Sequence, residues 1–269
     1  MVIVKRGGRE FAIDGYVKKV LDRCKSIVKF DWDMVFIIDG IEGCGKSCMA
    51  QLLGYYVDPT LNNSRIVFTA EKFKQAILNA EKYQAVIFDE SYQGLSSRGA
   101  MSFVNKNLIS MMAEIRQKNL FIFVVMPCVF DLDRYISLHR SRGLWHCYTN
   151  KFQRGYVKFY NIDLKKKLIM NGKKYYSYAF PKPNFKARFS KFYADNEIEY
   201  KKNKSGSLED REDSEELQLN KRKNQVELFK RLQGLEDIDL KHDLKMKILD
   251  LKRSTYYIWL RKFNLNEEF

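Results

Sequence analysis

Features typical of secretion, metal binding or membrane insertion are scarce in this sequence. The 269 residues contain only four prolines, three histidines and five cysteines, and no C-x-x-C pair occurs. An odd cysteine count without metal-type spacing is not typical of zinc proteins or disulfide-stapled domains, so we expect reduced thiols. The longest apolar run, residues 120–130, is interrupted by Pro127 and is too short to span a bilayer as a helix. The N-terminus lacks the apolar core of a signal peptide, so we expect a cytoplasmic protein without a membrane segment.

Acidic residues are outnumbered by basic ones. Lys and Arg total 48 against 33 Asp and Glu, which gives a net charge of +15 and a pI of about 9.4. A surplus of this size is typical of proteins that meet a polyanion, either nucleic acid or an anionic membrane surface. The alternative is a lysine-rich composition without such a partner. Hydrophobic residues make up 45% of the chain, so we expect a packed core, with room for one α/β domain and a smaller appendage.

Apolar and amphipathic segments alternate through the first 150 residues. Short apolar runs predict strands at 34–39, 65–69, 85–88, 120–126 and 144–148. Helical spacing predicts helices at 13–29, 48–57, 71–81, 105–118 and 132–140. Strands that alternate with helices in this way predict an α/β fold with a mainly parallel sheet flanked by helices.

Residues 40–47 match the pattern G-x-x-x-x-G-K-S without a mismatch, between an apolar strand and a helix. Glycines let backbone N–H groups turn inward on phosphates, and the following helix directs its positive end at the same anion. Lys46 would supply charge to the β- and γ-phosphates, and the Ser47 hydroxyl would bind Mg²⁺. The residues expected to bind the nucleotide are Gly40, Ile41, Glu42, Gly43, Cys44, Gly45, Lys46, Ser47 and Cys48.

A second motif follows the predicted strand 85–88, which ends in Asp89-Glu90. Asp89 is expected to hold Mg²⁺ together with Ser47. Glu90 is then placed to polarise the water that attacks the γ-phosphate. The alternative is a strand end with two solvated acids.

These two motifs, with Asp89 followed directly by Glu90, resemble the additional-strand, catalytic-glutamate class of P-loop ATPases. That class includes helicases, DNA translocases, packaging motors and AAA+ proteins, and the resemblance covers about residues 30–150. Within the class the chain is most similar to the small ATPases of phages, plasmids and mobile elements, which include zonular-occludens-toxin-like and DNA-translocase-like proteins. The zonular type usually carries a membrane segment, and none is expected here. The resemblance implies ATP and Mg²⁺ as cofactors, and no guanine-binding N/T-K-x-D motif is found.

The same class often uses an arginine from a neighbouring subunit, which implies a homo-oligomer such as a ring. The candidates for this catalytic arginine are Arg98, Arg116, Arg140 and Arg142. Each has an ordinary alternative as a surface or helix-terminal charge.

Residues 151–200 are expected to form a basic, aromatic β-hairpin extension of an ATPase core that spans 1–150. Between residues 151 and 193, twelve positive side chains stand against one acid, Asp163, and twelve aromatic rings are interleaved with them. The Asn171-Gly172 pair predicts the hairpin turn. The cations could bind phosphates and exposed rings could stack on bases, or the rings could simply pack on the core.

A charged segment, 201–223, is expected to be a linker or a solvated helix. Residues 224–269 are basic and predict helices at 224–232, 241–249 and 253–263. The last two resemble a helix-turn-helix, although the glycine common in the turn is missing. The alternative is a helical hairpin for docking or oligomerisation.

The sequence therefore predicts a P-loop ATPase from a virus or mobile element, which would act in the cytoplasm of the host cell. ATP hydrolysis would be coupled to work on DNA or to DNA binding, as in translocation, packaging, transfer or replication. A nucleotide-switched DNA-binding regulator or partition-type protein is the first alternative, and a small-molecule kinase is the second.

Overall fold

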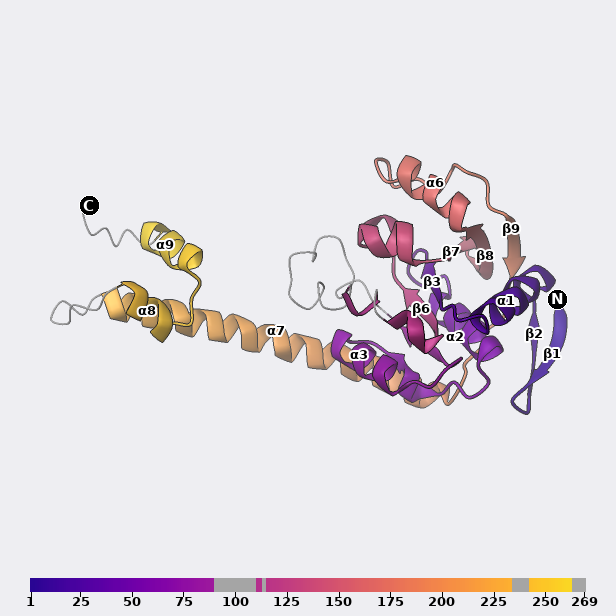
Figure 1. The fold of residues 1–269 in the computed structure, drawn as a ribbon, viewed down its shortest axis with the longest axis horizontal. Helices are drawn as coiled ribbons and strands as arrows, with labels where there is room; N and C mark the ends of the chain where they lie inside the picture. The colour runs from indigo at the N-terminus through magenta and orange to yellow at the C-terminus, as the bar shows by residue number, and fades with distance from the viewer. Residues whose placement is uncertain (90–109, 113–114, 234–241, 263–269) are drawn as a thin grey trace. The chain divides into compact units, whose positions relative to one another are not determined.

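The computed structural model describes residues 1–89, 110–112, 115–233 and 242–262 (Figure 1). The chain divides into two compact units, Met1–Lys204 and Ser205–Phe269. Within the described residues, no helix combines the length and apolar character that a bilayer-spanning helix needs.

One seven-stranded sheet forms the centre of the first unit, in the order β4-β5-β6-β3-β7-β8-β9. The strands are β3 (Met34–Asp39), β4 (Ile66–Val67), β5 (Ala85–Phe88), β6 (Phe121–Val125), β7 (Gly143–Asn150), β8 (Gln153–Asn161) and β9 (Phe185–Arg188). The first five in spatial order are parallel, and β8 and β9 are antiparallel to their neighbours. The predicted α/β class with a mainly parallel sheet is confirmed. β6 lies between β3 and β5, which is the position of an additional strand between the two motif-bearing strands.

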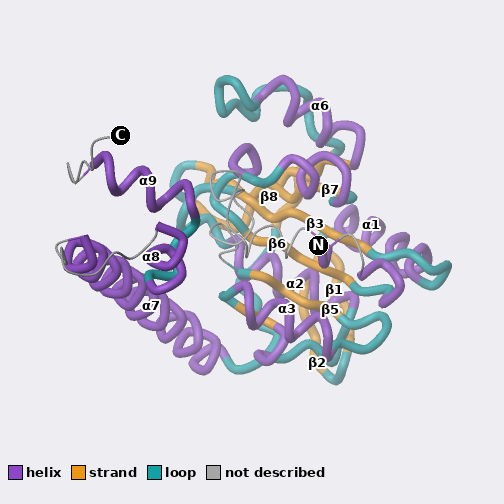
Figure 2. The backbone as a smooth tube through the Cα atoms, turned by 60° about the vertical axis from the view of Figure 1, so that its left-hand side comes forward, coloured by secondary structure: helices purple, strands orange, loops and turns teal. Residues whose placement is uncertain are grey.

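Helices cover both faces of this sheet (Figure 2). They are α1 (Gly15–Val28), α2 (Lys46–Val57), α3 (Ala70–Asn79) and α6 (Ile162–Gly172). Successive strand side chains point to opposite faces, so Phe36 of β3 packs in one core with α1 and α2. Val35 packs in the second core with α3 and α6. All six residues of β3 are buried because each face of the strand is covered.

The local signals at α1 and α3 explain where these helices begin. The Asp14 side chain accepts a hydrogen bond from the Tyr16 backbone N–H, and the Thr69 side chain accepts one from the Lys72 backbone N–H, so both residues act as N-caps. A two-stranded hairpin, β1 (Val2–Arg6) and β2 (Arg9–Ile13), precedes α1 and was not predicted.

The predicted hairpin at Asn171-Gly172 is wrong, because this pair ends the helix α6. Asn161 caps the start of α6, and Leu164, Leu168 and Ile169 provide the helical apolar spacing. The hairpin of this region instead joins β7 to β8 through a two-residue turn, Lys151-Phe152, in which both residues have positive φ. The sheet thus continues through residue 188, beyond the predicted core boundary at residue 150.

The charged segment 201–223 belongs to one long helix, α7 (Glu197–Gln233), so its backbone follows the helical alternative and not an irregular linker. In the second unit, α8 (His242–Ile248) and α9 (Arg253–Lys262) follow at the predicted positions. Phe229, Tyr256 and Trp259 form the centre of a small apolar cluster in this unit. The positions of α8 and α9 are therefore as expected, whereas residues 224–232 continue α7 and do not form a separate helix. DNA contact by α9 stays a prediction.

Candidate nucleotide site

The loop between β3 and α2 has the curled backbone that a phosphate cradle needs. Gly40, Gly43 and Gly45 have φ values of 140°, 74° and 99°. At Gly40 a Cβ atom would lie 2.1 Å from the Cys147 carbonyl oxygen of β7, so no side chain fits there. The glycines of the motif are thus required by backbone conformation and by the close approach of the neighbouring strand.

The side chain of the motif lysine folds back over this loop. Lys46 Nζ donates hydrogen bonds to the carbonyl oxygens of Gly40, at 2.8 Å, and Ile41, at 2.9 Å. Gly45 stands at the N-cap of α2, and among the described residues no side chain caps this helix end. Backbone N–H groups at an uncapped helix start, together with an ammonium over the loop, favour an anion.

A pair of thiols joins the loop to β7. Cys44 and Cys147 are both buried, and their side chains hydrogen-bond to each other. This hydrogen bond and the nearby Lys46 ammonium lower the pKa of Cys44 to about 7, whereas burial raises the pKa of Cys147. The contact between Cys44 and Cys147 therefore holds the middle of the loop against β7.

The residue directly before the loop, Asp39, is fully buried and was not singled out from the sequence. Its carboxylate accepts hydrogen bonds from His146 Nδ1 at 2.9 Å, from the Val129 backbone N–H at 3.0 Å and from the Tyr178 hydroxyl. The rings of His146 and Tyr178 stack at 3.9 Å. Burial and the adjacent carboxylate raise the pKa of Tyr178, so its hydroxyl stays protonated as a donor. These contacts fix the end of β3 and therefore the entry to the loop.

The acid of the second motif, Asp89, lies at the end of β5 and is 1% exposed. Its backbone N–H donates to the Val67 carbonyl at 2.8 Å, which holds it beside β4. The Tyr200 hydroxyl donates to Asp89 Oδ2 at 2.5 Å, and Lys204 Nζ lies 3.9 Å from the same oxygen. Burial and the Asp89 charge raise the pKa of Tyr200, so the phenol is the proton donor.

The Ser47 side chain also lies close enough to the Tyr200 hydroxyl to act against the rise of its pKa, so Ser47 and Asp89 both lie beside this oxygen atom. A hydroxyl and a carboxylate are hard oxygen donors of the kind that Mg²⁺ takes, usually with retained waters and phosphate oxygens. The two residues predicted to hold the metal are thus brought together, and the donor set fits it.

The predicted arginines have different surroundings. Arg140 is 8% exposed and forms a bidentate ion pair with Asp33, so this ion pair would have to break before Arg140 could reach a neighbouring subunit. The Arg142 guanidinium lies 4.8 Å from the centre of the Trp32 ring. The backbone of Arg116 lies in the short helix Ile115–Lys118, and its side chain is outside the described part. Arg98 and the predicted base Glu90 also lie outside the described residues.

No family model matches the sequence, and no curated protein matches it significantly. Among solved structures, the N-terminal domain of zonular occludens toxin from Neisseria meningitidis aligns with 60% of this chain and 95% of its own, at 16% identity and a TM-score of 0.40. The genome packaging NTPase B204 from Sulfolobus turreted icosahedral virus 2, in complex with AMPPCP, aligns with 49% of this chain and 93% of its own, at 15% identity and a TM-score of 0.35. These structures, a zonular occludens toxin and a viral genome packaging NTPase, are of the kinds named by the motif resemblance.

Proposed function

We propose that the chain binds ATP with Mg²⁺ at Gly40–Ser47 and hydrolyses it. The observation that supports this most directly is the convergence of Ser47 and Asp89 beside a loop whose lysine and uncapped helix start favour an anion. Adenine as the base follows from the motif resemblance.

In the proposed reaction a water oxygen attacks the γ-phosphorus, and the bond from that phosphorus to the β–γ bridging oxygen breaks to release ADP. Glu90 takes the proton of the attacking water. Lys46 and backbone N–H groups of the loop neutralise charge on the phosphates. Mg²⁺, when bound by Ser47 and Asp89, adds further charge neutralisation. An arginine from a neighbouring subunit of a homo-oligomer, Arg98, Arg116 or Arg142, would complete the site.

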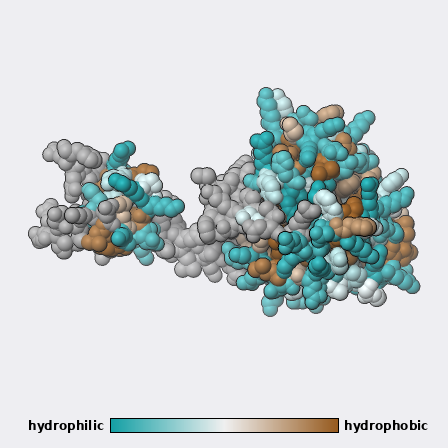
Figure 3. Space-filling model, viewed as in Figure 1, coloured by the Kyte–Doolittle hydropathy of each residue, from teal (hydrophilic) through white to brown (hydrophobic). Residues whose placement is uncertain are grey.

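We further propose that DNA is the partner of this ATPase. Hydrophilic residues cover most of the visible surface of the first unit, including the part over α6 (Figure 3). Nine of the cations in 151–193 are exposed: Lys151, Arg154, Lys167, Lys173, Lys174, Lys182, Lys186, Arg188 and Lys191. Most rings of the segment are buried or half-buried, but Phe152 at the β7–β8 turn is 99% exposed between Lys151 and Arg154. Exposed cations suit phosphates, and an exposed ring suits an unstacked base.

ATP hydrolysis with and without single- and double-stranded DNA tests the motor function. We expect nucleic acid to stimulate the wild-type chain, and we expect Glu90→Gln and Lys46→Ala to abolish hydrolysis while Glu81→Gln, which changes an exposed acid, retains it. Loss of nucleotide binding should accompany only Lys46→Ala. A wild-type rate that ignores both forms of DNA would contradict the motor function.

The DNA surface has its own test. Phe152→Ser should weaken binding of single-stranded DNA by about 1–3 kcal/mol if one base stacks on the ring. Phe30→Ser is the matched control, because Phe30 is 78% exposed and lies outside the basic segment. Equal affinities for the two variants would show that Phe152 does not contact a base.

A nucleotide-switched DNA-binding protein is the second candidate. It is favoured by α8 and α9, a basic helix pair whose packing around Trp259 resembles a helix-turn-helix. ATP-dependent protection of DNA from nuclease without translocation would support this candidate over a motor.

A further inference from the structure

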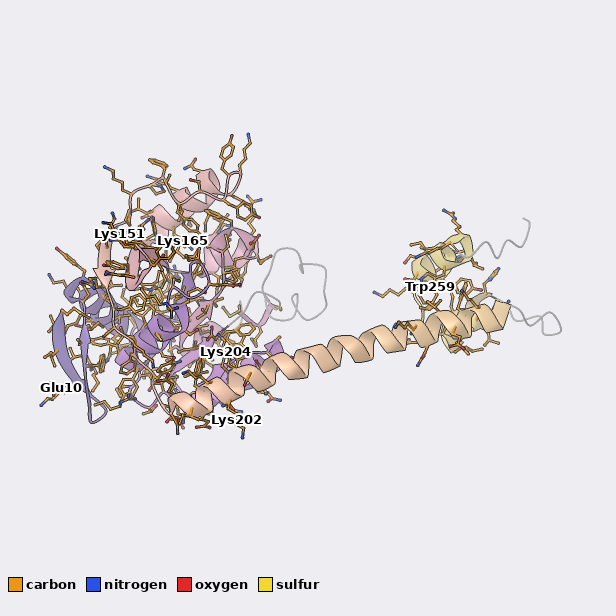
Figure 4. The ribbon with its side chains drawn as sticks, turned by 180° about the vertical axis from the view of Figure 1, so that it is seen from behind. Glu10, Lys151, Lys165, Lys202, Lys204 and Trp259 are labelled. Atoms are coloured by element: carbon orange, nitrogen blue, oxygen red, sulfur yellow. The ribbon has the colours of Figure 1, made fainter. Side chains whose placement is uncertain are left out.

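Two residues that neither motif requires lie in the nucleotide site. Tyr200 and Lys204 are one helical turn apart in the first turns of α7, within the first compact unit. The Tyr200 hydroxyl donates to Asp89 Oδ2 and lies beside Ser47, and Lys204 Nζ lies 3.9 Å from the same Asp89 oxygen. Figure 4 labels Lys204 together with Lys202, which is exposed and lies two residues earlier on α7.

The start of α7 is held firmly in this place. Asn196 accepts hydrogen bonds from the backbone N–H groups of Ile198 and Glu199, at 2.9 and 3.3 Å, and thus caps the helix. Glu199 accepts a bond of 3.0 Å from Asn63 Nδ2. The Tyr200 ring packs against Phe68, with ring centres 5.6 Å apart. These contacts aim the Tyr200 hydroxyl into the site.

The chemistry of the two side chains imitates a hydrated cation. A hydroxyl that bonds Asp89 and lies beside Ser47 takes the place that a cation shared by these two residues would take. The Lys204 ammonium beside it supplies the positive charge that a buried carboxylate needs. Mg²⁺ needs the same two oxygen donors, so both occupants compete for them.

We propose that Tyr200 and Lys204 hold Ser47 and Asp89 in the nucleotide-free chain, and that Mg·ATP displaces both side chains and releases the first turns of α7. This inference rests on the proposed nucleotide binding. Because α7 continues as one helix to Gln233, the nucleotide would act on the element that leads into the second unit.

The affinity for a fluorescent ATP analogue tests the competition. Tyr200→Phe and Lys204→Met should each bind the analogue about tenfold more tightly in Mg²⁺, because the cation no longer displaces a bond to a charged group. In EDTA we expect the advantage to disappear. The matched controls are Tyr175→Phe, which removes the hydroxyl of an exposed tyrosine, and Lys202→Met on the same helix. Both controls should bind as the wild type does. Equal or weaker Mg²⁺-dependent binding by Tyr200→Phe would overturn the proposal.

Amide hydrogen exchange of the wild-type chain gives a second readout that needs no variant. Residues 197–207 should exchange faster with Mg²⁺ and a non-hydrolysable ATP analogue than with the analogue in EDTA. If the chain binds the nucleotide but the exchange of residues 197–207 does not change, the proposed displacement of Tyr200 and Lys204 is overturned, whereas the proposed nucleotide binding is not. If the wild-type chain binds no nucleotide, both this inference and the proposed function fail.

Discussion

The ion pair of Asp33 and Arg140 allows a direct test of why Arg140 is present. Asp33 is 1% exposed, and Arg140 Nη1 donates to Asp33 Oδ1 at 3.0 Å while Nη2 donates to Oδ2. Arg140 Nε also donates to the Met112 carbonyl. Replacement by alanine would leave a buried carboxylate without its counter-ion. We expect Arg140→Ala to lose about 3–5 kcal/mol of unfolding free energy, a large part of the roughly 5–15 kcal/mol of a typical protein.

Urea unfolding of Arg140→Ala, Asp33→Ala and the double variant measures this pair. Fluorescence of Trp32 and Trp145 in a Trp259→Phe background reports the first unit alone. The double variant should be clearly more stable than the sum of the single losses predicts, because it removes the unpaired charge. The m-value should stay constant if only stability changes.

One result would refute the view that Arg140 stabilises the fold. In that case Arg140→Ala would unfold at the same urea concentration as the wild type but would not hydrolyse ATP. Mixing it with Glu90→Gln subunits would restore activity, since each variant would supply what the other lacks at a shared interface. That result would reinstate Arg140 as an arginine acting on a neighbouring subunit.

Two further predictions concern stability. Lys165 is fully buried and donates 2.6 Å bonds to the Ser141 carbonyl and hydroxyl, and burial, with Lys166 and Arg142 nearby, lowers its pKa to about 7. The folded chain therefore holds fewer protons than the unfolded chain between pH 7 and about 10, so stability should rise with pH by up to about 1.4 kcal/mol per unit. Urea midpoints of Lys165→Met across this range should lack that rise, and an unchanged slope would contradict the assignment. Trp259→Ala should cost the second unit about 3–5 kcal/mol, because Trp259 is 6% exposed against Phe229 and Tyr256. Limited proteolysis should then cleave 205–262 first, and equal resistance of that segment to the wild type would argue against this core.

Local pattern was enough to predict much of the fold and part of the site. Apolar runs located β3, β5 and β6, and the motif located the positive-φ glycines and Lys46. The Asn171-Gly172 prediction failed because a strong turn dipeptide also suits a helix end, and the apolar spacing of Leu164 and Leu168 favours a helix. The helix α6 was therefore predictable from the sequence, because the spacing of its apolar residues is a stronger signal than a single turn dipeptide.

Contacts between distant residues could not be predicted from any local pattern. Tyr200 bonds Asp89 across 111 positions, and Tyr178 bonds Asp39 across 139. A tyrosine hydroxyl becomes a site residue only when the fold brings it to a carboxylate, and nothing in its neighbours along the chain marks it. Arg140 illustrates the same point, since its partner Asp33 is 107 positions away.

The buried Asp39 limits how short a working version of this protein can be. A chain that stopped at residue 150 would keep both motifs and the five parallel strands but would lose the Tyr178 hydroxyl that Asp39 accepts from. It would also expose the edge of β7, which β8 now covers. We therefore expect such a fragment to aggregate or to bind nucleotide poorly, so the smallest fragment that tests the proposed function should extend through α6 and β9.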